Sequence, residues 1–426
     1  MSHNAILELL RQEVVPAIGC TEPIAVALTC ARAAELLGEE PETLDVEASA
    51  NLLKNGMGVI VPGTGQAGLQ IAAAVGALGG QSKLGLECLR DLDPNQVEKA
   101  REMLEQGRVN LSVADNDLLL YCKATARAGD KSGAAELRDS HANLTRAWKN
   151  GELVFEKEGE AVGSAISDEE WPLTFQRVYD FADSAPLEDI EFILEAARMN
   201  RNVAEEGLKT QYGLAVGKNM AAQMERKILA DDAPTFAVKL TAAAADARMA
   251  GVMMPVMSNS GSGNQGITCT MPVVAYAIRL NKNDEDLARA LILSHLTSIH
   301  IKRHLGRLSA HCGAMVAATA AACGIARLLG GGEKELEMTV RNMVGNVAGM
   351  ICDGAKSSCA LKVASAVNAG IQAAMLALEG RAVTGDEGIV SEDIEACIAN
   401  LGRLGSTGMR ETDKVILDIM LHKKKK

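Results

Sequence analysis

Aromatic residues are scarce in this chain of 426 residues, which has only 2 Trp, 4 Tyr and 5 Phe. Proline is also sparse, with 10 residues, whereas glycine accounts for 40. Nearly half of the chain is nevertheless hydrophobic, so a large core must be built mainly from small and aliphatic side chains. This composition favours closely packed helices joined by glycine turns. A chain of this length is too long to form one simple hydrophobic core, so two or three domains are predicted.

The chain also lacks an excess of positive charge and a long uncharged apolar run. Its net charge of −12 argues against nucleic acid as a partner, because the phosphate backbone requires a basic surface. No segment approaches the roughly 18 uncharged apolar residues that span a bilayer. The first residues, MSHNAILELLRQE, carry charges where a signal peptide needs an apolar run. We therefore expect a cytoplasmic protein with no membrane partner. A homo-oligomer is also expected.

The predicted fold class is α+β, with a mostly α-helical catalytic domain and a smaller embedded α+β domain. Residues 1–41 are predicted to form a helical segment that packs on the catalytic domain. Residues 42–160 contain several strand-like runs, and Asn150-Gly151 between two of them is a strong hairpin signal. From about residue 186 the pattern becomes helical. Residues 161–426 are therefore predicted to form an all-helical domain, which carries the C-terminal cysteines.

Ten cysteines in a cytoplasmic chain indicate metal binding or reactive thiols rather than disulfides. Cys312, Cys352 and Cys359 are the candidates for a metal site, although their spacing matches no ferredoxin pattern. The alternative is that they are small core residues, because free cysteine is often buried. Cys269 is ambiguous because it follows a glycine-rich loop. The remaining cysteines outside the N-terminal turn lie in apolar surroundings and are predicted to belong to the core: Cys30, Cys88, Cys122, Cys323 and Cys397.

The glycine-rich loop MSNSGSGNQGITCTMP, residues 257–272, combines hydroxyl and amide side chains with glycines. Glycines allow a backbone to approach a ligand, and successive N–H groups can bind an anion. A substrate carboxylate would suit such a loop, whereas the alternative is a polar linker between helices. The candidate substrate-binding residues are Ser258, Asn259, Ser260, Gly261, Asn264 and Gln265.

Cys20 lies in the segment VVPAIGCTEPIA, where prolines on both sides predict a turn. The following helix would place its N-terminus beside Cys20 and thereby lower the pKa of the thiol. Cys20 is thus a candidate catalytic base or ligand, and the alternative is a loop cysteine with no role. His300 and His304 have the i, i+4 spacing of two zinc ligands, but an ordinary surface or core pair is favoured.

The sequence resembles the L-cysteine desulfidase family, which is related to the α-chain of iron–sulfur L-serine dehydratase. The stretches that carry the resemblance span almost the whole chain: GCTEP, NLLKNGMGVIVPGTG, DARMAG, MSNSGSGNQGI, LSAHC, GMICDGAKSSCALK and AVTGDEGIV. The resemblance implies an oxygen-sensitive [4Fe–4S] cluster held by Cys312, Cys352 and Cys359. It also implies that Cys20, the cysteine of GCTEP, is a possible base.

The resulting functional hypothesis is β-elimination of L-cysteine to pyruvate, ammonia and hydrogen sulfide. A cluster with three cysteine ligands would leave one iron open as a Lewis acid for a small amino-acid substrate. The loop residues would bind the carboxylate, and Cys20 would take the α-proton. An L-serine dehydratase with the same cluster is the competing hypothesis within this class. A non-catalytic iron–sulfur or thiol sensor would belong to a different class, and pyridoxal phosphate chemistry would require a Schiff-base lysine such as Lys54, Lys218 or Lys356.

Overall fold

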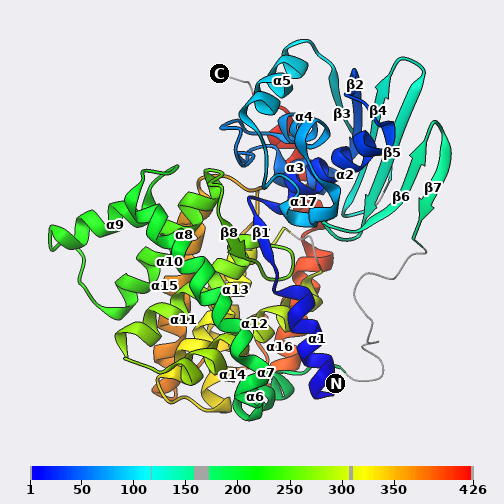
Figure 1. Ribbon diagram of the computed structural model, residues 1–426. Coiled ribbons are helices and arrows are strands. Elements are labelled where there is room, and N and C mark those ends of the chain that lie inside the picture. Colours follow the sequence, from blue (N-terminus) through cyan, green and yellow to red (C-terminus); the bar gives the residue numbers. More distant parts are fainter. Residues whose placement is uncertain (1, 117, 158–171, 307–309, 424–426) are drawn as a thin grey trace.

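The computed structural model describes residues 2–116, 118–157, 172–306 and 310–423. A sheet with its helices forms one half, and a helical body forms the other (Figure 1). The first half contains α2 (Thr21–Leu37), β2 (Thr43–Ala48), α3 (Ala50–Gly56), α4 (Leu69–Gly79), η1 (Ser82–Glu87), α5 (Pro94–Glu105), β3 (Val109–Val113), β4 (Tyr121–Ala128), β5 (Lys131–Arg138), β6 (Leu144–Lys149) and β7 (Glu152–Glu156).

The helical body begins with α1 (His3–Glu13) and resumes after the sheet. It contains α6 (Phe175–Ser184), α7 (Leu187–Ile190), η2 (Glu191–Ile193), α8 (Leu194–Lys209), α9 (Val216–Glu225), α10 (Ala233–Met249), α11 (Gly263–Arg279), α12 (Asp284–Leu305), α13 (Gly313–Leu328), α14 (Glu333–Val347), α15 (Cys359–Leu378) and α16 (Ile394–Arg403). After η3 (Leu404–Gly408), the last helix, α17 (Arg410–Leu421), returns to pack on α3 in the sheet half (Figure 1).

The six-stranded sheet has the order β3-β2-β4-β5-β6-β7. Strands β2 and β3 are parallel, and the other neighbouring pairs of this sheet are antiparallel. Alternate residues of β4 are buried because one face of the sheet is covered by α2, which also packs on α4. The β6–β7 hairpin turns at Asn150 and Gly151, whose φ angles of 51° and 85° are those of a type I′ turn. This confirms the hairpin expected from the sequence.

The described residues form two large hydrophobic cores. One contains α2, α4, α5 and the sheet, and the other contains α1 and the helices from α6 to α16. The predicted α+β class with a mostly helical body is thereby confirmed. The N-terminal segment is split between the cores, because α1 packs in the helical body whereas α2 covers the sheet. The predicted three-domain division stays a prediction, and its boundary at residues 160 and 161 lies outside the described residues.

A small antiparallel ribbon joins the start of the chain to the helical body. Its strands are β1 (Pro16–Ile18) and β8 (Pro255–Met257), with Ile18 opposite Pro255 and Pro16 opposite Met257. The chain leaves β1 toward Cys20 and leaves β8 into the glycine-rich loop. Two segments separated by more than two hundred residues are therefore placed side by side.

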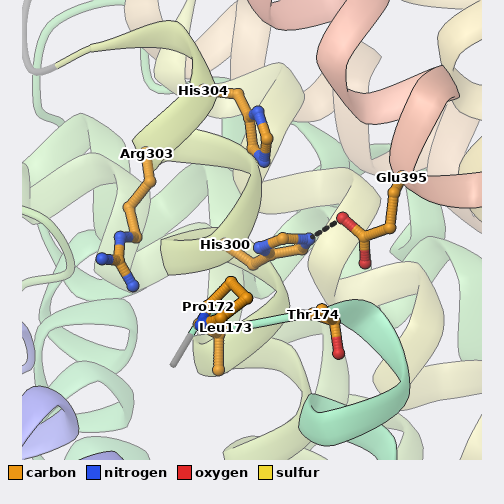
Figure 2. Close-up of a pocket in the computed structure, with 7 residues that line it drawn as sticks. All are labelled: Pro172, Leu173, Thr174, His300, Arg303, His304 and Glu395. Carbon is orange, nitrogen blue, oxygen red and sulfur yellow. Dashed lines mark hydrogen bonds and ion pairs between the residues drawn. The ribbon is translucent and has the colours of Figure 1, made fainter. Parts of the chain in front are cut away.

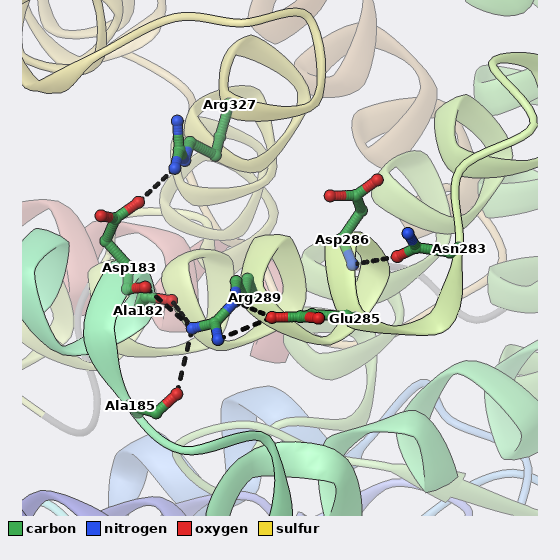
Figure 3. Close-up of polar contacts among 8 residues, drawn as sticks. All are labelled: Ala182, Asp183, Ala185, Asn283, Glu285, Asp286, Arg289 and Arg327. Atoms are coloured by element: carbon green, nitrogen blue, oxygen red, sulfur yellow. Dashed lines mark hydrogen bonds and ion pairs between the residues drawn. The ribbon is translucent and has the colours of Figure 1, made fainter.

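A guanidinium group holds α6 against α12. Arg289 of α12 donates to the carbonyl oxygens of Asp183 at 2.9 Å and Ala185 at 3.1 Å, at the end of α6. Arg327 of α13 pairs with the Asp183 carboxylate (Figure 3). These contacts satisfy carbonyls that the helix itself leaves unpaired. They fix the end of α6 within the helical body.

Helix α15 is long and apolar enough to span a membrane by length and composition, which was not expected from the sequence. Half of its most apolar window is buried, and the helix packs against α10, α13 and α14. Such packing is typical of a core helix, and the absence of a membrane partner stays a prediction.

We predict that Gly133→Ala lowers the free energy of unfolding by about 1–3 kcal/mol, the usual cost of overpacking. A Cβ at Gly133 would lie 2.2 Å from the carbonyl oxygen of Ala33 and 2.5 Å from the backbone nitrogen of Leu37. Both atoms belong to the α2 backbone and cannot turn aside. Denaturant unfolding measures the effect, and Gly349→Ala is the control because its Cβ would meet nothing within 4 Å. Equal stability of both variants would contradict this account of how α2 packs on the sheet.

Candidate functional site

Two of the candidate metal-binding cysteines are aligned by a backbone bridge between distant segments. The Cys312 N–H donates to Met350 O at 2.9 Å, and the Cys352 N–H donates to Ala310 O at 2.6 Å. His311 and Ile351 form an antiparallel bridge between them. The segment that precedes α13 is thus paired with the segment that follows α14, which brings Cys312 and Cys352 to one place.

Cys359, the first residue of α15, completes the group. Burial is the main cause that raises the pKa of Cys312 to about 12, and the nearby thiols of Cys352 and Cys359 raise it further. Burial likewise raises the pKa of Cys359, and the nearby Cys352 raises it further. The Cys359 sulfur also accepts a hydrogen bond from the Lys356 N–H at 3.4 Å. The structure therefore brings together the three cysteines that the sequence singled out.

Cys20 lies beside this group, at the N-cap position of α2. It packs in one small apolar cluster with Val59, Met249 and the partly buried Cys359. Burial raises the pKa of Cys20 to about 12, although the neighbouring Arg248 guanidinium lowers it. The expectation that the helix start would lower this pKa is wrong for the structure as it stands, because desolvation of the thiolate outweighs the local positive field.

The glycine-rich loop makes a tight turn next to Cys20. Ser260 and Gly261 have φ angles of 49° and 77°, and Asn259 and Ser262 exchange backbone hydrogen bonds across the turn. The Ser258 N–H donates to Val15 O, and the Ser260 N–H donates to Glu13 O, both at 2.9 Å. These donors are used within the protein, so residues 258–260 do not form the anion-binding nest expected from the sequence.

A buried polar network fixes the loop to α12. The Asn259 amide donates to His295 O at 3.2 Å, and its Oδ1 accepts from the Gln265 amide at 2.9 Å. Gln265 also donates to Ser298 Oγ at 3.0 Å. Burial lowers the pKa of His295 to about 3, so its ring is neutral. Ser258, Asn259 and Ser260 therefore help to hold the loop in place, and their predicted role in substrate binding stays a prediction.

Several buried polar atoms near Cys20, or near Cys312 in the case of Gln265, have no hydrogen-bond partner within the described part of the chain. They are Arg248 Nε, Asn264 Oδ1, Gln265 Oε1 and Asn55 Oδ1. The Asn264 amide contacts Met249 Sδ at 3.4 Å, and Arg248 donates to Gly19 O at 2.8 Å, so both residues lie next to Cys20. Buried polar groups are normally paired, and an unpaired set around a thiol cluster is typical of a binding site for a small polar molecule.

The sheet half supplies the opposite side of the site. Glu22 of α2 accepts from the Asn55 amide at 3.3 Å, and its carboxylate lies 4.0 Å from His141. A Cβ on Gly261 would lie 3.2 Å from His141 Nδ1, so the tip of the loop touches this histidine. The site is thus built at the junction of the two halves.

Gly354 allows the cysteine-bearing loop to reach the sheet half. Its φ is 90°, and a Cβ there would lie 2.4 Å from the carbonyl oxygen of Lys54. The next residue, Ala355, donates its N–H to Asn55 O at 3.1 Å. Lys54 is buried and forms an ion pair with Asp413 of α17. The loop that carries Cys352 and Cys359 therefore packs directly on the backbone of α3.

Comparisons with known proteins identify the family of this chain. Residues 83–418 match the model of the family described as the serine dehydratase alpha chain. The chain belongs to the serine dehydratase α-chain family. A UPF0597 protein of Oleidesulfovibrio alaskensis is 58% identical over 98% of both chains. A UPF0597 protein of Bacteroides fragilis is 49% identical, again over 98% of each, and one of Chromobacterium violaceum is 47% identical over 98% of this chain and 97% of its own.

The remaining cysteines, other than Cys20, lie in apolar surroundings. Those predicted to be core residues are buried in the two large cores: Cys30, Cys88, Cys122, Cys323 and Cys397. Cys269, whose sequence context is ambiguous, packs with Ala317 and Ala320 inside the helical body. All ten cysteines are free thiols. The core assignment is confirmed.

Some residues of the site are not evident from the sequence. Glu22 and Asn55 lie inside the stretches GCTEP and NLLKNGMG, so a signal is present, but the cysteine and the glycines of these stretches attract attention first. His141 has no local signal, because its loop enters the site only in three dimensions. Arg248 lies in the stretch DARMAG, where the sequence allows either an ion pair with Asp246 or binding of a carboxylate, and Asp246 instead accepts from the Gly217 N–H at 3.0 Å.

We predict that Gly354→Ala makes the thiols of Cys352 and Cys359 react faster with a maleimide in the metal-free protein. The new Cβ would push the loop away from α3 and expose both sulfurs. Mass spectrometry of the labelled peptides at successive times gives the rates. Gly380→Ala is the matched control, because Gly380 has a φ of 70° but nothing within 4 Å of its Cβ. The two substitutions share the backbone strain, so equal labelling rates would show that the contact with Lys54 does not position the loop.

Proposed function

We propose that this chain is an iron–sulfur-dependent lyase that degrades L-cysteine by β-elimination to pyruvate, ammonia and hydrogen sulfide. The observation that carries the proposal is the convergence of Cys312, Cys352 and Cys359 beside Cys20 and a set of unpaired buried polar atoms. Membership of the serine dehydratase α-chain family supports β-elimination as the reaction class.

The donor set fits a [4Fe–4S] cluster with one open iron. Iron–sulfur clusters are held by cysteine thiolates, and a cluster used only for electron transfer normally has four. Cys312, Cys352 and Cys359 would hold the cluster here, and metal binding would offset the burial that raises the pKa of Cys312 and Cys359. When bound, such a cluster would supply a Lewis acid for the departing sulfur.

The polar atoms near Cys20 are suited to orienting a small amino acid. Arg248 is buried and carries the charge that an α-carboxylate requires, and its Nε is unpaired in the described structure. Asn264 Oδ1 and Gln265 Oε1 are acceptors that suit an α-ammonium group. We therefore assign substrate binding to Arg248, Asn264 and Gln265, with Gly261 shaping the turn. Ser258, Asn259 and Ser260 support these residues through the bonds described above.

Cys20 remains the proposed base for the α-proton. It adjoins Cys359, and the Arg248 charge favours its thiolate, whereas burial favours its thiol. Cys20 must therefore lose its own proton before it accepts one from the substrate. Loss of the α-proton and of the hydrosulfide group, which together make one hydrogen sulfide, converts L-cysteine to aminoacrylate. Its tautomer takes up one water and releases ammonia and pyruvate, which balances the reaction.

L-serine is the second candidate substrate, because the family model is that of a serine dehydratase. Pyridoxal phosphate chemistry is less well supported, since each of the lysines considered is engaged. Lys54 pairs with Asp413, Lys356 pairs with Asp353, and Lys218 donates to Lys209 O at 2.7 Å.

Release of sulfide from L-cysteine tests the proposal. The protein is assayed under strict anaerobiosis, before and after reconstitution with iron and sulfide and removal of the excess sulfide. We expect release only after reconstitution and its loss in air, because an open iron is exposed to oxygen. Cys352→Ala should retain less iron and lose activity, whereas Cys323→Ala, a core cysteine, should retain both. Turnover of serine alone would identify a serine dehydratase, and a cluster with no turnover of either amino acid would indicate a sensor.

Cys20→Ser tests the proposed base separately from the cluster. We expect at least a hundredfold loss of turnover, within the usual range for removal of an acid–base group, with unchanged iron content and absorption spectrum. Loss of iron together with activity would make Cys20 a ligand or a structural residue. Unchanged turnover would exclude it as the base.

A further inference from the structure

A second cluster of ligand-type side chains lies in the helical body, outside the thiol site. His300 and His304 are one turn apart on α12, and Glu395 reaches them from the first turn of α16. One potential ligand atom from each residue lies within 4.8 Å of the other two. Figure 2 shows the His304 ring directed toward His300 and Glu395.

The geometry of these groups is close to that of a bound metal ion. Zinc–ligand distances of about 2.0–2.1 Å place two tetrahedral ligands roughly 3.3 Å apart. His300 Nε2 and Glu395 Oε2 are 2.8 Å apart and hydrogen-bonded to each other. A bound ion would replace that bond, and the His304 ring nitrogen, which lies within 4.8 Å of both atoms, would move closer. His304 is exposed, whereas His300 is buried.

The carboxylate of Glu395 is held in position by the backbone. Its Oε1 accepts a hydrogen bond from the Phe175 N–H at 2.5 Å, at the start of α6, while Oε2 faces His300. A ligand that is oriented by a second hydrogen bond is a regular feature of metal sites. Gly402 adds to the closeness of α12 and α16, because a Cβ there would lie 2.5 Å from His304 Cβ.

A cavity of about 260 Å³ adjoins the three residues and is also lined by Pro172, Leu173, Thr174 and Arg303. It provides room for water or a small ligand in a fourth coordination position. Arg303 opposes a cation by its charge, and the negative charge of Glu395 counteracts it. Two imidazoles and one carboxylate suit Zn²⁺ and related ions, in contrast with the thiols of the other site.

We propose that His300, His304 and Glu395 form a binding site for a divalent transition-metal ion of the Zn²⁺ class. The ion would join α12 to α16 and, through Glu395 and Phe175, to the start of α6. The site uses no residue of the proposed lyase centre and does not depend on that function.

Zinc binding to the untagged full-length protein tests the site. The protein is titrated anaerobically against a chromophoric chelator, with His304→Ala as the variant and His422→Ala as the control that removes an exposed histidine elsewhere. We expect the wild type and His422→Ala to bind one equivalent of zinc at this site. His304→Ala should bind that equivalent at least about tenfold more weakly, because even the loss of an outer-shell partner lowers metal affinity ten- to a hundredfold. Circular dichroism confirms that the variants are folded.

Cobalt separates this site from the cysteines. Co²⁺ bound by imidazole and carboxylate gives visible d–d bands without the near-ultraviolet charge transfer of thiolate ligands. Both His304→Ala and Glu395→Gln should lose these bands, while thiolate bands from the cysteine site stay unchanged. Equal zinc affinity and equal cobalt spectra in wild type and His304→Ala would overturn the proposal, as would a wild-type protein that binds metal only through its thiols.

Discussion

The junction of the two halves depends on backbone segments that approach one another more closely than a Cβ atom permits. Gly19 lies against Pro62, where a Cβ would come within 2.2 Å of the ring. Gly354 makes the corresponding contact with α3. Each of these glycines lies beside a residue of the proposed lyase centre. The geometry of the centre therefore rests on close packing across the junction rather than on any one strong bond.

Helices of the helical body also pack closely at small residues. Gly207 and Gly217 both meet Ala243 of α10 at distances where a Cβ would clash with its backbone or Cβ. Helices that approach so closely leave little space for aromatic rings, which accounts for the scarcity of aromatic residues. The polar network of Asn259, Gln265 and His295 is buried inside this packing. Because each member bonds to another, the network gives the loop one conformation.

Burial has opposite consequences for the two proposed ligand sites. At the thiol site it keeps Cys20 and Cys312 protonated until a positive centre offsets the cost of the thiolate. At the second site the ligands are imidazoles and an acid already held by hydrogen bonds, and one of them is exposed. The soft, enclosed thiols suit iron and sulfide, whereas the harder N and O donors suit zinc. Donor chemistry would thus give the two proposed sites different metal preferences within one chain.

The sequence by itself determined the local features of this protein. It predicted the α+β class, the hairpin at Asn150-Gly151, the buried core cysteines and the family, because periodicity, turn residues and long motifs are local properties. Tertiary structure decided which helix belongs to which core, and α2 packs on the sheet rather than on the helical body. It also revealed His141 and the pairing of Glu395 with His300, which lie ninety-five residues apart. The pKa of Cys20 shows the physical reason: a helix start is visible in the sequence, but the desolvation that outweighs it arises only when distant segments exclude water.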